Sequence, residues 1–268
     1  DGSVIAQILN TLPLAQAMGQ LNANFDCAKF QWIGNLSDDV AMVDVWHTAP
    51  AKSVEEARKV EVIMGATSPT ALGTMIPLAM NNVLGTRFKI VTGYEAGAQV
   101  DLAVERGEVH GRAGESWSVL QATRPQLLKE RKLIHLAQMG MRKEPGLEDV
   151  PLLTELARTD EERRILEIVS SPSMVGKPTV VGPKVPKDIV AALRKAYDAT
   201  MKDPQFLADA GKRGLAIGPV SGVELQKIVE EILAAPPEIK AKVQAALDPK
   251  GLPPGKAKKK KTKAAGAK

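Results

Sequence analysis

Short apolar runs alternate with helix-like segments along almost the whole of this chain, and this alternation constrains the fold more than any other feature. The runs at 4–9, 30–36, 60–64 and 88–92 have the length of buried strands. The segments between them have apolar residues at three- and four-residue spacing, which indicates amphipathic helices. Such an order is typical of α/β folds, in which crossover helices join parallel strands. The sequence therefore predicts an α/β protein with mixed, mostly parallel sheets.

Several helix starts are marked by a Ser or Thr that stands three residues before a Glu. The pairs are Ser53 with Glu56, Thr159 with Glu162 and Ser221 with Glu224. In such a capping box each side chain binds a backbone amide that the helix leaves unpaired. We expect helices over 70–84, 98–106 and 160–169, and extended segments at 174–181 and 215–217.

The positive charge of the chain lies in its last residues. The formal net charge is +5, and eight of the 36 Lys and Arg residues fall in 249–268, which has no Asp or Glu. Residues 1–248 therefore hold 28 basic and 31 acidic side chains, a net charge of −3. A mildly acidic body is a poor nucleic-acid binder, so we expect no nucleic-acid partner for it.

The segment 249–268 is almost entirely Lys, Ala, Gly and Pro. It has too little apolar surface to fold, which predicts a disordered Lys-rich tail. The tail either solubilises the chain or reflects an over-extended reading frame, and the alternative is contact with an anionic surface.

Signatures of metal, redox and covalent chemistry are weak. Cys27 is the single cysteine, so an internal disulfide is excluded, and packing is a better interpretation of it than a nucleophile. His47, His110 and His135 are widely separated, and neither an H-E-x-x-H motif nor a phosphate-binding glycine motif occurs. No apolar run reaches the roughly 18 residues of a membrane span. We therefore expect no metal and no cofactor.

Three strand-to-helix junctions carry polar groups, and the first is the loop 65–71. Gly65 permits a tight turn, and Thr67, Ser68 and Thr70 supply hydroxyls beside Ala66. The helix that follows presents unpaired N–H groups and the positive end of its dipole, which suits a carboxylate or a phosphate. Ordinary capping of the helix explains the same residues, and the sequence leaves both interpretations open.

The second and third junctions follow the runs at 88–92 and 109–113. One contains Tyr94, Glu95, Gly97 and Ala98, and the other Glu115, Ser116 and Trp117. Ligands of open α/β sheets lie beyond the carboxyl ends of the strands, so the three loops are expected to converge there. An alternative is an enzyme acting on a small organic acid, with Glu95 and Glu115 as its acid and base.

Segments spread over residues 1–247 resemble, in order, the substrate-binding proteins of tripartite tricarboxylate transporters, known as the Bug family. The segments are 30–34 with 50–56 (P-A-K-S-V), 65–69, 88–97, 105–109, 149–155 (D-V-P-L-L-T-E) and 185–204. The resemblance implies a two-lobed periplasmic-binding-protein type II-like fold and no enzymatic activity. Its ligand would be a mono-, di- or tricarboxylate held in an interlobe cleft, and its partners would be the subunits of a membrane transporter. It also implies a periplasmic location.

The same resemblance implies that the first lobe is incomplete. Residues 1–3 resemble a D-G-x-T segment inside that lobe, and the family's P-x-x-x-G-G-x-x-D loop has no counterpart here, as expected of an N-terminally truncated member. Lobe one would comprise 1–40 with 170–248, and lobe two 41–169. Asn10 and Thr11 would be the remaining ligand contacts of lobe one. The candidate ligand-binding residues are thus Asn10, Thr11, Ala66, Thr67, Ser68, Thr70, Tyr94, Glu95, Gly97, Ala98, Glu115, Ser116 and Trp117.

Overall fold

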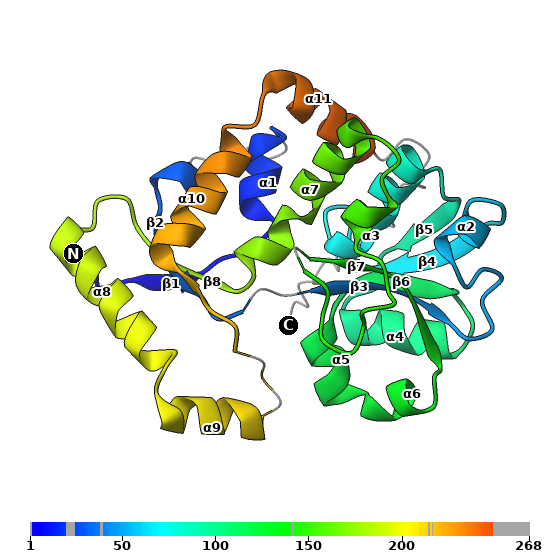
Figure 1. Cartoon of the computed structure of the whole chain (residues 1–268), viewed down its shortest axis with the longest axis horizontal. Helices are drawn as coiled ribbons and strands as arrows, with labels where there is room; N and C mark the ends of the chain where they lie inside the picture. The colour runs from blue at the N-terminus through cyan, green and yellow to red at the C-terminus, as the bar shows by residue number, and fades with distance from the viewer. Residues whose placement is uncertain are drawn as a thin grey trace, which may run out of the picture.

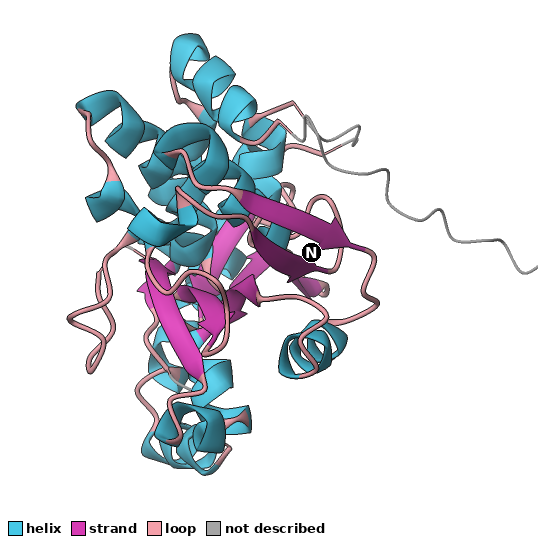
Figure 2. Ribbon diagram, turned by 90° about the vertical axis from the view of Figure 1, so that its right-hand side faces the viewer, coloured by secondary structure: helices cyan, strands magenta, loops and turns pink. Residues whose placement is uncertain are grey.

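The computed structural model describes residues 2–19, 25–37, 40–140, 142–213, 215 and 217–248. The strands of these residues form two sheets, which lie side by side in Figure 1 with helices around both. Figure 2 shows, from the side, helices above and below the strands. The predicted α/β class is confirmed. The Lys-rich tail predicted at 249–268 lies outside the described residues.

The first sheet is antiparallel and has helices on both faces. Its order is β1-β8-β2-β9, with the bounds Ile5–Gln7 (β1), Pro178–Val181 (β8), Gln31–Asn35 (β2) and Val220–Ser221 (β9). Trp32 and Val180 pack against Leu225 of the helix α10 (Gly222–Leu233). The neighbouring residue Ile33 points the other way and packs against Val190 of the helix α8 (Lys187–Thr200).

The second sheet is mixed. Its order is β5-β4-β6-β3-β7, with the bounds Phe88–Thr92 (β5), Val62–Ala66 (β4), Gly111–Ser116 (β6), Ala41–Trp46 (β3) and Leu133–Met139 (β7). Only β4 pairs in parallel, with β5 and β6, whereas β3 is antiparallel to both β6 and β7. The expectation of mostly parallel sheets is therefore wrong for the described residues. Alternating strands and helices give parallel pairs only when each helix brings the chain back to start the next strand beside the previous one. In the first sheet β8 breaks this rule, because it comes late in the sequence and lies antiparallel between β1 and β2.

The helices begin largely where the sequence predicts. Their bounds are Leu12–Ala17 (α1), Val54–Ala57 (α2), Leu72–Ala79 (α3), Gly97–Glu105 (α4), Trp117–Thr123 (α5), Pro125–Lys129 (α6), Asp160–Val175 (α7), Lys187–Thr200 (α8), Pro204–Lys212 (α9), Gly222–Leu233 (α10) and Pro237–Ala246 (α11). A π-helical turn, Met80–Leu84, follows α3, and 3-10 turns lie at Cys27–Lys29 and Leu153–Leu156. Ser53, Thr159 and Ser221 each accept a hydrogen bond from the backbone amide three residues on, which confirms the Ser or Thr half of the three predicted capping boxes.

The helix α7 runs six residues past its predicted end and continues through a proline. Pro172 has no N–H and leaves the carbonyl of Ile168 without its helical partner. The hydroxyl of Ser171 donates to that carbonyl at 2.7 Å. This compensation lets the helix include 174–175, which we expected to be extended.

Two other local expectations differ from the structure. Leu215 and Ile217 are not in a strand, and the short strand β9 lies at Val220–Ser221 instead. The helix α6 has no apolar period of its own and was not expected, and it begins at Pro125, where a proline suits the first turn.

The main hydrophobic core packs the helices α1, α7 and α11 against the second sheet. Leu14 and Met18 of α1 share this core with Val43 of β3 and Val243 of α11. Gln244 also donates to the carbonyl of Met18 at 2.7 Å. Figure 1 shows α1, α7 and α11 above the region where the two sheets meet. These helices hold the loops that follow β1 and β4 close together.

Candidate functional site

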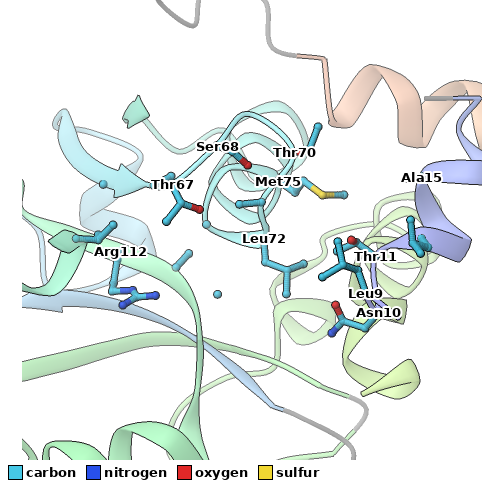
Figure 3. Close-up of a pocket in the computed structure, with 18 residues that line it drawn as sticks. Leu9, Asn10, Thr11, Ala15, Thr67, Ser68, Thr70, Leu72, Met75 and Arg112 are labelled. Carbon is cyan, nitrogen blue, oxygen red and sulfur yellow. The ribbon is translucent and has the colours of Figure 1, made fainter. Parts of the chain in front are cut away.

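A cavity of about 430 Å³ lies between the loop that follows β1 and the loop that follows β4. Figure 3 shows side chains from both loops pointing into it, with Thr67 and Ser68 on one side and Asn10 and Thr11 on the other. It is lined by residues 9–12, 15, 65–68, 70–73, 75, 100 and 112–114. Six predicted site residues are thus brought together, namely Asn10, Thr11, Ala66, Thr67, Ser68 and Thr70.

The loop after β4 keeps its shape through its own backbone and a nearby strand. The carbonyl of Ser68 accepts hydrogen bonds from the Thr74 hydroxyl at 2.7 Å and from the Ala71 amide at 3.2 Å. The carbonyl of Thr67 accepts from the Gly93 amide at 3.3 Å. A side chain at Gly65 would stand 2.9 Å from Val100, so glycine allows α4 to lie close to β4. The backbone is thereby fixed, and the hydroxyls of Thr67 and Ser68 stand at the cavity.

The helix α3 begins at the cavity without a side-chain cap. Its N-cap residue is Ala71, which has no group that accepts a hydrogen bond from the first turn. The first amides of a helix have no partner within the helix, and they carry the positive end of its dipole. This end of the cavity is therefore suited to an anion.

The strand β6 approaches the start of α3 closely enough to require glycine. Gly114 has a φ of +81°, and a Cβ there would lie 2.8 Å from the Leu72 Cβ and 2.9 Å from the Gly73 nitrogen. A Cβ on Gly73 would lie 3.0 Å from the Ala113 carbonyl oxygen. The close approach forms one wall of the cavity.

The opposite wall comes from the loop between β1 and α1. Asn10 donates from Nδ2 to the carbonyl of Pro172 at 3.0 Å, which ties the loop to α7. Thr11 is the N-cap residue of α1, and its side chain makes no capping hydrogen bond. Leu9, Leu12 and Ala15 give this wall an apolar surface.

Arg112 lines the cavity and was missed by the sequence analysis. It follows Gly111 in β6, and its Nη1 donates to the Gly97 carbonyl at 3.3 Å and to the carboxylate of Asp101. A second arginine, Arg124, lies 3.0 Å from the same Asp101 and donates to Glu115. No sequence motif marked Arg112, because its place depends on the pairing of β6 with β4.

Glu115 lies in this charged cluster and not at the cavity. Burial raises the pKa of its carboxyl, and the charges of Arg112 and Arg124 act against that rise. Ser116 caps α5 through its hydroxyl. Trp117 lines a different cavity of about 380 Å³, together with Arg142. Gly114, at the start of the third predicted junction, therefore joins the first junction at the cavity, whereas Glu115, Ser116 and Trp117 do not.

The second junction lies beside the cavity and does not line it. Tyr94 packs among Ala103, Val104 and Val109, and burial together with the nearby Glu108 charge raises the pKa of its hydroxyl. Glu95, Gly97 and Ala98 are likewise absent from the cavity wall, to which α4 contributes Val100. Glu95 is exposed, and its amide is capped by Gln99 at 3.0 Å. Glu95 and Glu115 do not share a cavity among the described residues, so the paired-carboxylate alternative gains no support.

The remaining reactive side chains also lie away from the cavity. Cys27 is buried, and burial raises the pKa of its thiol to about 11, which disfavours the thiolate nucleophile. His135 binds Asp44 through Nδ1 at 2.6 Å, at a different place in the second sheet. In the described part of the chain, no group of three His, Cys, Asp or Glu side chains could hold a metal ion. No helix in the same residues is both long enough and apolar enough for a membrane span.

Comparison with known proteins shows the fold. No protein-family model matches the sequence, and no curated protein matches it significantly. Among solved structures, a TctC solute-binding protein from Polaromonas is 18% identical, with a TM-score of 0.64 over 92% of this chain and 78% of that one. The periplasmic binding protein BugD is 17% identical, with a TM-score of 0.62 over 92% and 79% of the two chains.

A third similar structure contains a ligand. MatC from Rhodopseudomonas palustris with bound malate is 16% identical, with a TM-score of 0.58 over 91% of this chain and 78% of that one. The chain therefore has the fold of TctC- and Bug-type solute-binding proteins, as the resemblance implied.

Proposed function

We propose that this chain is a receptor of the tripartite tricarboxylate transporter type that binds a small carboxylate in the cavity between the loops of the two sheets. One observation carries the proposal. The uncapped start of α3 and the hydroxyls of Thr67 and Ser68 face Asn10 and Thr11 across a single cavity. Oriented amides and hydroxyls bind carboxylates without net charge, which suits a chain whose residues 1–248 carry −3.

The fold comparison supports the same proposal. Proteins of this fold include one described with bound malate, a dicarboxylate, and one described as a periplasmic binding protein. By analogy, this chain would act outside the cytoplasm and pass its ligand to the membrane subunits of a transporter.

We further propose the lobe assignment implied by the resemblance, with lobe one formed by 1–40 and 170–248 and lobe two by 41–169. The helix α7 spans the boundary at 169–170, and its residue Pro172 accepts the hydrogen bond from Asn10. Closure of the lobes on a ligand would bring Asn10 and Thr11 toward Thr67 and Ser68.

Isothermal titration calorimetry against acetate, succinate, malate, adipate and citrate tests the receptor proposal. We expect at least one of these acids to bind with a stoichiometry of one. Thr67→Pro should weaken that binding, since it removes a hydroxyl at the cavity wall. A matched control is Thr123→Pro at the last residue of α5, which is away from the cavity and should leave affinity unchanged. Absence of binding by all five acids would count against the proposal.

A further inference from the structure

Arg112 is the one charged side chain among the residues that line the described cavity. Its side chain is 16% exposed, so it is mostly withdrawn from water while still reaching the cavity wall. Figure 3 shows Arg112 across the cavity from Asn10. Two other features that attract anions, the start of α3 and the hydroxyl of Ser68, belong to the same cavity.

The guanidinium of Arg112 uses one of its three nitrogens for its contacts with the described residues. Nη1 contacts the Gly97 carbonyl at 3.3 Å, the Asp101 carboxylate, and Glu115 at 3.8 Å. Nε is buried and has no hydrogen-bond partner among the described residues. A buried donor without a partner is unfavourable, and one on an arginine at a cavity indicates an acceptor that the protein itself does not supply.

The neighbouring arginine keeps the acidic residues paired independently of Arg112. Arg124 lies 3.0 Å from Asp101 and donates to Glu115, so both carboxylates have a second cation. Arg124 does not line the described cavity, whereas Arg112 does. A ligand carboxylate could therefore attract Arg112 without leaving Asp101 or Glu115 as an unpaired buried charge, which would be costly.

The approach of Arg112 to α4 depends on the absence of a side chain at Gly97. A Cβ on Gly97 would lie 3.3 Å from Nη2 and 3.4 Å from Nη1 of Arg112. Gly97 is also the first residue of α4, whose N-cap Ala96 offers no side-chain cap. The guanidinium is thus held between a helix start and the cavity wall.

We propose that Arg112 turns toward the cavity when a ligand binds and holds one carboxylate through its Nε edge, and that the site selects dicarboxylates whose second carboxylate lies at the start of α3. This inference depends on the proposed receptor function and adds to it the class of acid and the residue that selects it. Arginine presents paired donors that match the two oxygens of a carboxylate. A monocarboxylate can satisfy only one end of such a cavity.

The test compares succinate with its half-amide, succinamate, on the wild-type chain and on Arg112→Gln. For the wild type we expect the dissociation constant of succinamate to be about 10- to 100-fold higher than that of succinate, the range of a hydrogen-bonded charge. In Arg112→Gln the two compounds should bind with nearly equal, weak affinity. The ratio of the two dissociation constants, compared between wild type and Arg112→Gln, isolates the contact between Arg112 and the second carboxylate.

Arg106→Gln is the matched control, because Arg106 is an exposed arginine just after α4 that neither lines the described cavity nor pairs with Asp101 or Glu115. It should keep the wild-type preference for succinate. Arg112→Lys takes the place of Arg112→Gln in this comparison if Arg112→Gln does not fold. It retains the charge and loses the paired donors, so the preference should fall to an intermediate value.

Each outcome separates this inference from the receptor proposal. If the wild type binds succinate and Arg112→Gln keeps the same preference, the role of Arg112 is wrong and the receptor proposal stands. If the wild type binds neither compound, the dicarboxylate inference is wrong, and binding of another acid would still support a receptor. A structure with succinate should place a carboxylate oxygen within about 3.2 Å of Nε or Nη2 of Arg112.

Discussion

At the scale of single residues, Gly114 determines how closely β6 approaches α3. It combines a φ of +81° with a position where a Cβ would lie 2.8 Å from Leu72. We expect Gly114→Ala to lower the unfolding free energy by about 2 kcal/mol or more, since backbone strain and overpacking add. Urea denaturation measures this change.

Gly107→Ala is the control for that prediction. Gly107 has a φ of +74°, and nothing lies within 4 Å of the position of its Cβ. The substitution should cost only the strain of the backbone, about 1 kcal/mol. Equal losses of unfolding free energy in the two variants would show that the close contact between β6 and α3 adds no cost of its own at residue 114. Carboxylate binding should suffer only in Gly114→Ala, because only that residue forms the cavity wall.

Glu115 should give the protein a distinctive pH dependence. Burial raises the pKa of its carboxyl above the usual 4.5, although Arg112 and Arg124 oppose the rise. A raised folded-state pKa means that its contribution to stability is fully present below about pH 4.5 and is lost as the pH rises through the folded pKa. Relative to Glu115→Gln, the wild type should therefore lose unfolding free energy between pH 4.5 and neutrality, as followed by urea denaturation at each pH.

Glu162 provides a comparison with the opposite sign. The hydrogen bond from Arg158 is the main cause that lowers the pKa of the Glu162 carboxyl. Its contribution is present above the usual pKa of 4.5 and is lost as the pH falls through the folded value, so Glu162→Gln should differ most from wild type at neutral pH. The same pH trend for both variants would contradict the assignment of these shifts.

Part of the cavity could be predicted from single residues, and part could not. Thr67, Ser68 and Thr70 follow a strand and precede a helix, so their position at a helix start is a local property of the sequence. Arg112 had no such signal. It reaches the cavity because β6 pairs with β4, and because Gly97 leaves room for the guanidinium. Both conditions involve residues distant in the sequence.

At the scale of elements, the start of α3 offers a change that separates stability from binding. Ala71 is the N-cap residue and lines the cavity, but it provides no cap. Ala71→Asp should raise the unfolding free energy by about 1 kcal/mol, since Asp caps a helix and complements its dipole. It should also weaken carboxylate binding at least tenfold, because its charge stands where the ligand carboxylate is proposed to lie.

Ala71→Asn separates the cap from the charge. Asn caps about as well as Asp and is neutral, so stability should rise similarly while affinity falls less. Urea denaturation and calorimetry on the three proteins give both quantities. Undiminished binding by Ala71→Asp would place the anion elsewhere in the cavity.

The elements themselves show where sequence patterns stop being informative. Caps at Thr159 and Ser221 were predicted correctly, because a cap depends on residues three positions apart. The continuation of α7 through Pro172 was not, since it needs the Ser171 hydroxyl and the burial of 169–173 in the fold. The antiparallel pairing of β8 with β1 and β2 was missed for a similar reason, because it joins strands more than 140 residues apart.

At the scale of the whole molecule, α1 and α11 of the proposed lobe one share a core with the second sheet, and α7 also contributes Val175 to the core of the first sheet. Val243 of α11 is fully buried in this core with Leu14 of α1 and Val43 of β3. Lys242 of α11 also pairs with Glu161 of α7. Two lobes joined only by crossover segments would unfold separately, whereas a shared core couples them. We therefore expect a single cooperative unfolding transition.

Val243→Ala tests this coupling. Losing two buried methyl groups should lower the unfolding free energy by about 2 kcal/mol. The exposed Val223 of α10 is the control, and Val223→Ala should change stability by about 0.5 kcal/mol or less.

Hydrogen exchange on Val243→Ala then distinguishes one cooperative unit from two, because the slowest amides of a cooperative unit report the same global free energy of unfolding. Protection should fall equally at Trp32 in the first sheet and at Val43 in the second. A loss of protection confined to Val43 would mean that the two lobes unfold separately, so that only the crossover segments limit lobe closure. A loss of protection at both residues would mean that the lobes are coupled, so that closure on a carboxylate must also shift α1 and α11.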